Sequence, residues 1–276
     1  MIDEALMTTL MWAVLAGLAA SVACGVGAVP VFIPGLDPSK HRGLGYAFAG
    51  GLMFAASVYN LILPGMAMTG DGWALGSILP VLVGLLLGAG FLAVVDRYLD
   101  AHEKLGEMAE RGGWGGRVGL LVFIAMTVHS IPEGVAVGTG FTSDAKHAAS
   151  AAASIDLSGV QANLGPTLAL AIGIHNIPEG LAVAIPLRSA GASFAKCFLA
   201  AFLTSLPQPI AAIPAVLLAW VFEPIMPALM GFAAGAMIFL VMLELIPDAL
   251  EEEKPAPTAW AFTLGFAAML LIQVLL

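Results

Sequence analysis

Charged side chains are scarce in this chain of 276 residues, where Asp, Glu, Lys and Arg make up 11% and hydrophobic residues 60%. The mean hydropathy of +0.97 lies far above that of a water-soluble domain. Basic residues are the scarcer charge, with 10 Lys and Arg against 19 Asp and Glu and a formal net charge of −9. This balance argues against nucleic acid as a partner, because phosphate backbones are bound by basic surfaces.

Cysteine is nearly absent, since Cys24 and Cys197 are the only two and both lie in apolar stretches. A disulfide framework is therefore not expected. The first apolar stretch is longer than the core of a signal peptide, and no basic flank precedes it. We interpret it as a retained membrane span.

The chain is rich in apolar runs, each close to the roughly 20 residues that cross a bilayer as a helix. The connections between them are short, so residues 1–276 are expected to form a single transmembrane domain. The pattern predicts an all-α polytopic membrane protein with eight transmembrane helices. The eight predicted segments are Met7–Val29, Leu44–Leu63, Leu75–Val95, Val118–Phe141, Leu164–Leu187, Phe194–Val221, Ile225–Ile246 and Ala259–Leu276.

The basic residues are distributed unevenly between the two sides of this arrangement. All but one of the 10 lie in or beside the connections on one side, and Lys146 lies on the other. The positive-inside rule makes the first side cytoplasmic and places both termini outside. The longest cytoplasmic connection, about 97–117, contains His102, Glu103 and Glu107. A solvated polar loop is favoured there over a metal-capturing segment.

Two segments carry nearly the same motif, AMTVHSIPEGVAVG in the fourth and AIGIHNIPEGLAVA in the fifth. His129 and Glu133 are four residues apart, as are His175 and Glu179, so on a helix each pair lies on one face. A buried carboxylate is costly unless a partner neutralises it. Two neutral imidazoles and two carboxylates suit mixed N/O ligation of one divalent cation, whose charge the carboxylates cancel.

A single His–Glu pair at this spacing is more often a structural hydrogen bond than a metal site. Two near-identical copies in adjacent spans favour a site. Pro132 and Pro178 have no N–H, so the carbonyls of Val128 and Ile174 lose their helical partners. Free carbonyls at membrane depth are tolerated where they line a cavity.

Further polar residues lie within apolar segments or just beyond their ends. Asn60 and Gln208 are each either a ligand or an interhelical hydrogen-bonding group, and the second interpretation is favoured for Asn60. The prolines of TSLPQP around Gln208 predict a distorted helix. Glu244 and Asp248, four residues apart, are either an exit path for a metal or solvated carboxylates.

The outer connection between the two motif segments, Thr142–Asn163, contains Asp144, His147 and Asp156. These residues either attract cations to an entrance or are ordinary solvated side chains.

The segments also indicate internal symmetry. The fourth and fifth are similar in sequence yet run in opposite directions across the membrane. GGLMFAASVYNLILPG in the second resembles AAGAMIFLVMLELIPD in the seventh, and these also run oppositely. Both pairs fit inverted repeats, an architecture that places the substrate site near the midplane at broken helices.

The paired His-x-Ile-Pro-Glu-Gly motifs, the eight spans and GFAAGAMIFLVMLELIP resemble the ZIP family of divalent-metal transporters, with bacterial members the nearest. The resemblance covers most of the chain. It implies uptake of zinc, and in some members iron, manganese or cadmium, into the cytoplasm across a bacterial inner membrane. It also implies a 3+2+3 helix arrangement, a homodimer, and metal as the transported substrate rather than as a catalytic cofactor.

Carried over by position, the resemblance makes five residues the main metal ligands, with Gln208 and Glu244 as further members of the site. Gln208 stands where family members with a two-metal centre usually have glutamate, and Asn176 replaces a frequent aspartate. Ser130 replaces a frequent asparagine, and Leu243 stands where a histidine often precedes Glu244. We therefore expect one metal ion in the main position. The five main ligands are His129, Glu133, His175, Asn176 and Glu179.

Two other classes of function use the same His and Glu residues. An intramembrane metalloenzyme is disfavoured, because neither motif has the HExxH pattern: Ser130 and Asn176 follow the histidines. A proton-coupled carrier of an organic solute would use His and Glu as relay groups. The prediction is a transporter and not an enzyme.

Overall fold

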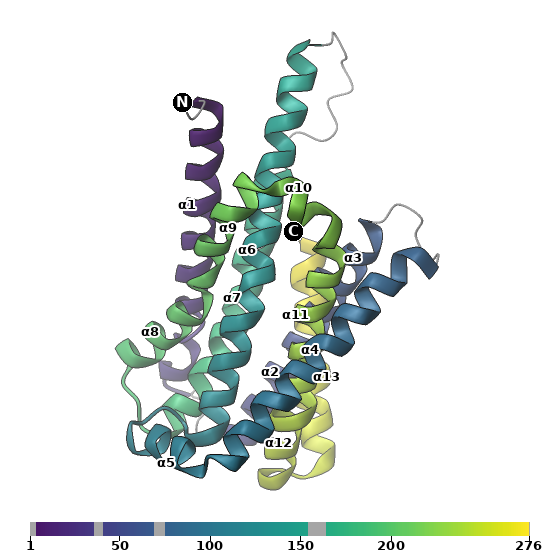
Figure 1. The fold of residues 1–276 in the computed structure, drawn as a ribbon. Coiled ribbons are helices and arrows are strands. Elements are labelled where there is room, and N and C mark those ends of the chain that lie inside the picture. The colour runs from purple at the N-terminus through teal and green to yellow at the C-terminus, as the bar shows by residue number, and fades with distance from the viewer. Residues whose placement is uncertain (1–3, 36–40, 69–74, 154–163, 276) are drawn as a thin grey trace.

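The computed structural model describes residues 4–35, 41–68, 75–153 and 164–275, and in these ranges it consists of helices joined by short turns, with no strand (Figure 1). The predicted all-α class is therefore confirmed. The long helices are α1 (Glu4–Val26), α2 (Arg42–Ala56), α4 (Leu75–Ala101), α6 (Gly116–Ala153), α7 (Leu164–Ser189), α11 (Met226–Leu240) and α13 (Pro255–Leu275). The shorter α-helices are α3 (Leu63–Ala67), α5 (Glu103–Arg111), α8 (Phe194–Ser205), α9 (Pro207–Leu217), α10 (Ala219–Phe222) and α12 (Ile246–Glu252).

Within the described part of the chain, 7 helical stretches are long and apolar enough to cross a membrane. Each overlaps one of the predicted segments. The fifth predicted segment, which forms α7, is not among the seven, so the count of eight stays a prediction. The seven stretches are Glu4–Phe32, Arg42–Ala67, Ile78–Ala101, Gly116–Ser143, Phe194–Leu217, Ala219–Glu252 and Pro255–Val274.

The helices pack as two groups (Figure 1). The site group consists of α1, α6, α7, α8 and α9, and the flanking group of α2, α4, α11 and α13. Glycines bring the backbones of partner helices together: a Cβ added to Gly88 of α4 would lie 1.9 Å from the Phe232 carbonyl oxygen of α11. In the site group, a Cβ on Gly180 of α7 would lie 1.7 Å from the Cys24 carbonyl oxygen of α1. Such close approaches are typical of packing between membrane helices.

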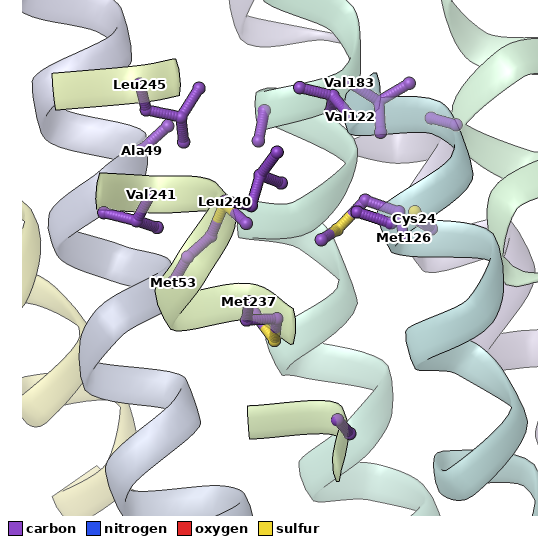
Figure 2. Packing of buried hydrophobic residues seen from close by; sticks show 14 of the residues in the cluster. Cys24, Ala49, Met53, Val122, Met126, Val183, Met237, Leu240, Val241 and Leu245 are labelled. Carbon is purple, nitrogen blue, oxygen red and sulfur yellow. The ribbon is translucent and has the colours of Figure 1, made fainter. Parts of the chain in front are cut away.

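Buried apolar side chains fill the space where the two groups meet. Figure 2 shows side chains of both groups facing one another there, and each of those labelled is buried. The site group contributes Cys24, Val122, Met126 and Val183, and the flanking group contributes Ala49, Met53, Met237, Leu240, Val241 and Leu245.

Two helices contain a π-helical segment at matching places. These segments, η3 (Ser57–Ile62) and η5 (Val241–Leu245), each end two residues before a proline, Pro64 or Pro247. The first residue after each segment donates its N–H to the carbonyl five residues earlier. A proline lacks the N–H and crowds the carbonyl four residues before it, so a widened turn relieves the clash. The match supports the predicted likeness of the second and seventh segments.

The sixth predicted segment is broken, as its prolines indicated. It forms α8 and α9, which are separated by Leu206, and Pro207 starts α9. The break places Gln208 in the first turn of α9.

Two predicted loops are wrong in part. The connection at about 97–117 is largely helical, because α4 continues to Ala101 and α5 follows. Glu107 and Arg111, four apart and 3.4 Å from each other, support α5. Glycines with positive φ then turn the chain into α6, whose first residue, Gly116, has φ +63°.

The outer connection also differs from expectation, because α6 continues through residue 153. Asp156 lies outside the described residues, and so do the side chains of Asp144 and His147. Their predicted role at an entrance stays a prediction.

Candidate metal centre

The two motifs lie on two antiparallel helices of the site group. His129 and Glu133 are on α6, and His175 and Glu179 are on α7. The end of α7 returns to the start of α6, where a Cβ on Gly115 would lie 2.8 Å from Pro186. The four side chains are deeply buried, with at most 2% of their surface exposed.

The four side chains converge on one point. His129 Nε2 lies 3.3 Å from Glu133 Oε1 and 3.0 Å from Glu179 Oε1. His175 Nε2 lies 3.0 Å from Glu179 Oε1, and its Nδ1 lies 3.5 Å from Glu133 Oε1. One ligand atom from each residue lies within 4.8 Å of all the others, so the group has the geometry to hold a metal ion.

These atoms are close together, yet they are not hydrogen bonded. Both nitrogens of each imidazole, Glu133 Oε1 and Glu179 Oε1 are buried without a hydrogen-bond partner. Unpartnered buried polar atoms are costly, and two carboxylates at this depth need positive charge nearby. The donor set of imidazole nitrogens and carboxylate oxygens suits Zn²⁺ and similar divalent ions.

Two side-chain amides beside the centre, those of Asn176 and Gln208, hydrogen bond to each other and to neighbouring groups. Gln208 donates from Nε2 to Glu133 Oε2 and to Asn176 Oδ1, the latter at 3.4 Å. Asn176 donates from Nδ2 to Gln208 Oε1 at 3.1 Å and to the Ala20 carbonyl at 3.0 Å. The amides therefore hold Glu133 and join α1, α7 and α9 around the centre.

Glu244, the remaining predicted ligand, is not among the four convergent residues. It lies in η5, is 5% exposed, and accepts a hydrogen bond from Arg117 Nη1 at 2.5 Å. Arg117 was not predicted from the sequence as the partner of Glu244. A buried carboxylate in an apolar segment requires a cationic partner, and that requirement was the available signal.

A cavity of about 130 Å³ reaches the centre from one side. Glu133 and His175 line it, as does Asn60 of η3, so Asn60 faces the approach to the centre. Residues from both groups complete the wall: Tyr59, Leu61, Pro64, Pro132, Ala136, Ile172, Met230 and Gln273.

Fold and site together define a polytopic helical membrane protein with a buried His/Glu cluster that can hold a divalent metal ion. A family model described as ZIP zinc transporter matches residues 159–273. The zinc transporter GufA of Myxococcus xanthus is 32% identical over 257 residues, which cover 91% of this chain and 95% of that protein. The chain belongs to the ZIP zinc transporter family.

Other relatives with similar sequences are also zinc transporters by name. The zinc transporter ZIPB of Bordetella bronchiseptica is 32% identical over 273 residues, covering 96% of this chain and 81% of that protein. A relative from Arabidopsis thaliana is 36% identical over 252 residues, which cover 91% of this chain. This chain spans 37% of that longer plant protein.

Proposed function

We propose that this chain is a transmembrane transporter that takes divalent metal cations into the cytoplasm through the centre between α6 and α7. Zn²⁺ is the foremost substrate, and Fe²⁺, Mn²⁺ and Cd²⁺ are further candidates, because mixed imidazole and carboxylate sites accept all of them. The observation that carries the proposal is the convergence of four buried, unpartnered ligand groups in a chain of zinc-transporter relatives.

In this proposal the ligands have different roles. His129, Glu133, His175 and Glu179 contact the ion directly, since their free ligand atoms converge. Asn176 and Gln208 hold the centre in shape through their amides. Glu244 acts later on the path, on the side of the centre away from the cavity.

We further propose that residues 1–276 form one transmembrane domain of eight helices in a 3+2+3 inverted-repeat arrangement. Its support is the repeated motif in α6 and α7 and the matching segments η3 and η5. The distribution of basic residues supports termini outside the cytoplasm, so the cavity opens outward. Similarity to bacterial transporters supports a bacterial inner membrane. A homodimer is part of the same proposal.

Metal uptake into proteoliposomes tests the function. We expect the purified protein to take up radioactive zinc, and His175→Ala to reduce the initial rate by more than about tenfold, because it removes a direct ligand. Glu107→Ala is the matched control, since it removes an exposed carboxylate of α5 away from the centre. Fluorescence-detected gel filtration verifies that each variant remains folded in detergent.

Two results would contradict the proposal. The first is normal zinc uptake by His175→Ala. The second is uptake of a proton-coupled organic solute by the wild-type protein with no response to divalent metals.

A further inference from the structure

Arg117 lies at the far end of α6 from the cavity. It precedes His129 by twelve residues, about 18 Å along a helix axis. Ala136, which lines the cavity, follows the motif on the same helix. The centre therefore lies between the cavity on one side and Arg117 on the other.

Three carboxylates surround the Arg117 guanidinium. Its Nε donates to Asp100 Oδ1 at 2.8 Å, its Nη1 to Glu244 Oε1 at 2.5 Å, and its Nη2 to Asp96. The side chain of Glu244 is 6% exposed and that of Asp96 14%. The planar guanidinium can bond several carboxylates at once, which a lysine cannot do in this geometry.

All three of these bonds join the two helix groups. Arg117 belongs to α6 of the site group, whereas Asp96 and Asp100 belong to α4 and Glu244 to η5, which continues α11 of the flanking group. The amides around the centre, in contrast, bond within the site group. Arg117 thus holds α6 against the flanking group at the end remote from the cavity.

The path from the centre toward Arg117 is closed by apolar side chains. Val122 and Met126 of α6 and Met237 and Leu240 of α11 belong to one buried apolar cluster, and all four are at most 1% exposed (Figure 2). An ion leaving the centre in this direction meets these buried apolar side chains while the groups remain in contact. Leaving on this side requires the groups to separate there, and that separation breaks the bonds of Arg117.

We infer that Arg117 is an ionic latch that holds the transporter with its centre facing the cavity and its opposite end closed. This inference rests on the proposed function, in which the centre faces one side of the membrane at a time. Breaking the latch shifts the population toward the form in which the Arg117 end opens and the cavity end closes.

A cysteine reporter in the cavity measures this population. Asn60→Cys places a thiol in the cavity wall, and an impermeant thiol reagent labels it in purified protein held in nanodiscs without zinc. The native thiols Cys24 and Cys197 are at most 1% exposed, and the chain without Asn60→Cys gives their background. We expect Arg117→Gln to slow the labelling by about threefold or more, as the closed-cavity form gains population.

Two comparisons separate a latch from a bond that only supports the fold. Arg111→Gln removes the same charge from a pair confined to α5 and should leave the labelling rate unchanged. Arg117→Lys keeps the charge without the three-way geometry and should give an intermediate rate. If Arg117→Gln does not accumulate, the double variant Arg117→Gln with Glu244→Gln is used instead. It also removes the latch, and it leaves no unpaired buried charge at position 244.

Equal or faster labelling of the Arg117 variants, compared with Arg111→Gln, would overturn the latch. Its failure is distinguishable from failure of the proposed function. Slowed labelling in a protein that takes up no zinc would leave the latch standing and reject the function, whereas zinc uptake with unchanged labelling would do the opposite.

Discussion

At the residue scale, the centre contains polar groups of two kinds. The ligand atoms of His129 and Glu179 that face the centre have no hydrogen-bond partner, whereas the amides of Asn176 and Gln208 bond one another. A neutral amide adds no negative charge, and imidazoles bind metals in their neutral form. The two motif carboxylates thus compensate one divalent ion. A second ion a few ångströms away would meet strong repulsion in a site of low dielectric.

Gln208→Glu should therefore change the number of bound metal ions. We expect the wild-type protein to bind one Zn²⁺ per chain in the centre. The variant should bind two, because its new carboxylate would lie beside Glu133 and require further positive charge. Titration calorimetry and anomalous diffraction give the count. Gln208→Ala, which removes the amide without adding charge, should still bind one ion, and two strong peaks in the wild-type centre would refute the prediction.

The sequence alone was informative about the residues of the centre. Repetition and spacing placed His129, Glu133, His175 and Glu179 on common faces, and the structure brings their ligand atoms together. The pairing of Arg117 with Glu244 was not predictable, because it joins residues 127 apart in sequence through packing of two helix groups. Local periodicity contains no information on such a contact.

At the scale of the element, close packing of helices fixes the site group. A Cβ on Gly180 would lie 1.7 Å from the Cys24 carbonyl oxygen, and this backbone cannot yield without moving α1 from α7. Gly173, on the same helix, has no described atom within 4 Å of its Cβ position apart from its chain neighbours and the backbone of its own helix. The same helix therefore contains one glycine that cannot accept a larger side chain without movement of the backbone and one that can.

Gly180→Ala should destabilise the protein, and Gly173→Ala should not. We expect Gly180→Ala to cost about 1–3 kcal/mol through overpacking. Gly173→Ala should be neutral or stabilising by up to about 1 kcal/mol, because alanine favours helix more than glycine does. Thermal unfolding in detergent, followed by tryptophan fluorescence, compares the two. A similar melting temperature for both variants would contradict the close α1–α7 contact.

The positions of the helix interruptions were predictable from the sequence, but the type of distortion at each position was not. The prolines of the sixth segment indicated the break that separates α8 from α9 at Leu206. Pro64 and Pro247 equally indicated local distortion, yet the widened turns of η3 and η5 appear only in the structure. A proline removes one hydrogen bond, and the surrounding packing determines whether the helix bends, breaks or widens.

At the scale of the whole molecule, the proposed orientation in the membrane rests on the distribution of charge. Glu4 begins α1, and Glu251 lies in α12 near the turn to α13, which the distribution of basic residues places in the cytoplasm. Both residues are exposed. We expect an impermeant thiol reagent to label Glu4→Cys in intact cells and to label Glu251→Cys only after permeabilisation. Labelling in the reverse order would invert the topology and the proposed direction of transport.

The arrangement of the membrane spans was also largely predictable from the sequence. Seven of the predicted spans have helical counterparts that meet the length and hydropathy of a membrane span in the described ranges. The polar connection after the third span was expected as a loop, but Glu103–Arg111 forms helix α5. Polarity there indicated contact with water, which a surface helix satisfies as well as a loop does.

In the proposed transport cycle, the two carboxylates of the centre also determine how the protein responds to voltage. With a dication bound to neutral imidazoles, Glu133 and Glu179 leave the centre electrically neutral. The empty centre has two negative charges until His129 and His175, which lie 3.0–3.5 Å from the carboxylate oxygens, take up protons. Moving one elementary charge through a potential of 100 mV changes the free energy by about 2.3 kcal/mol. In the proposed cycle, the membrane potential therefore acts on the return of an empty centre that has taken up no protons. It acts hardly at all on the passage of the loaded centre.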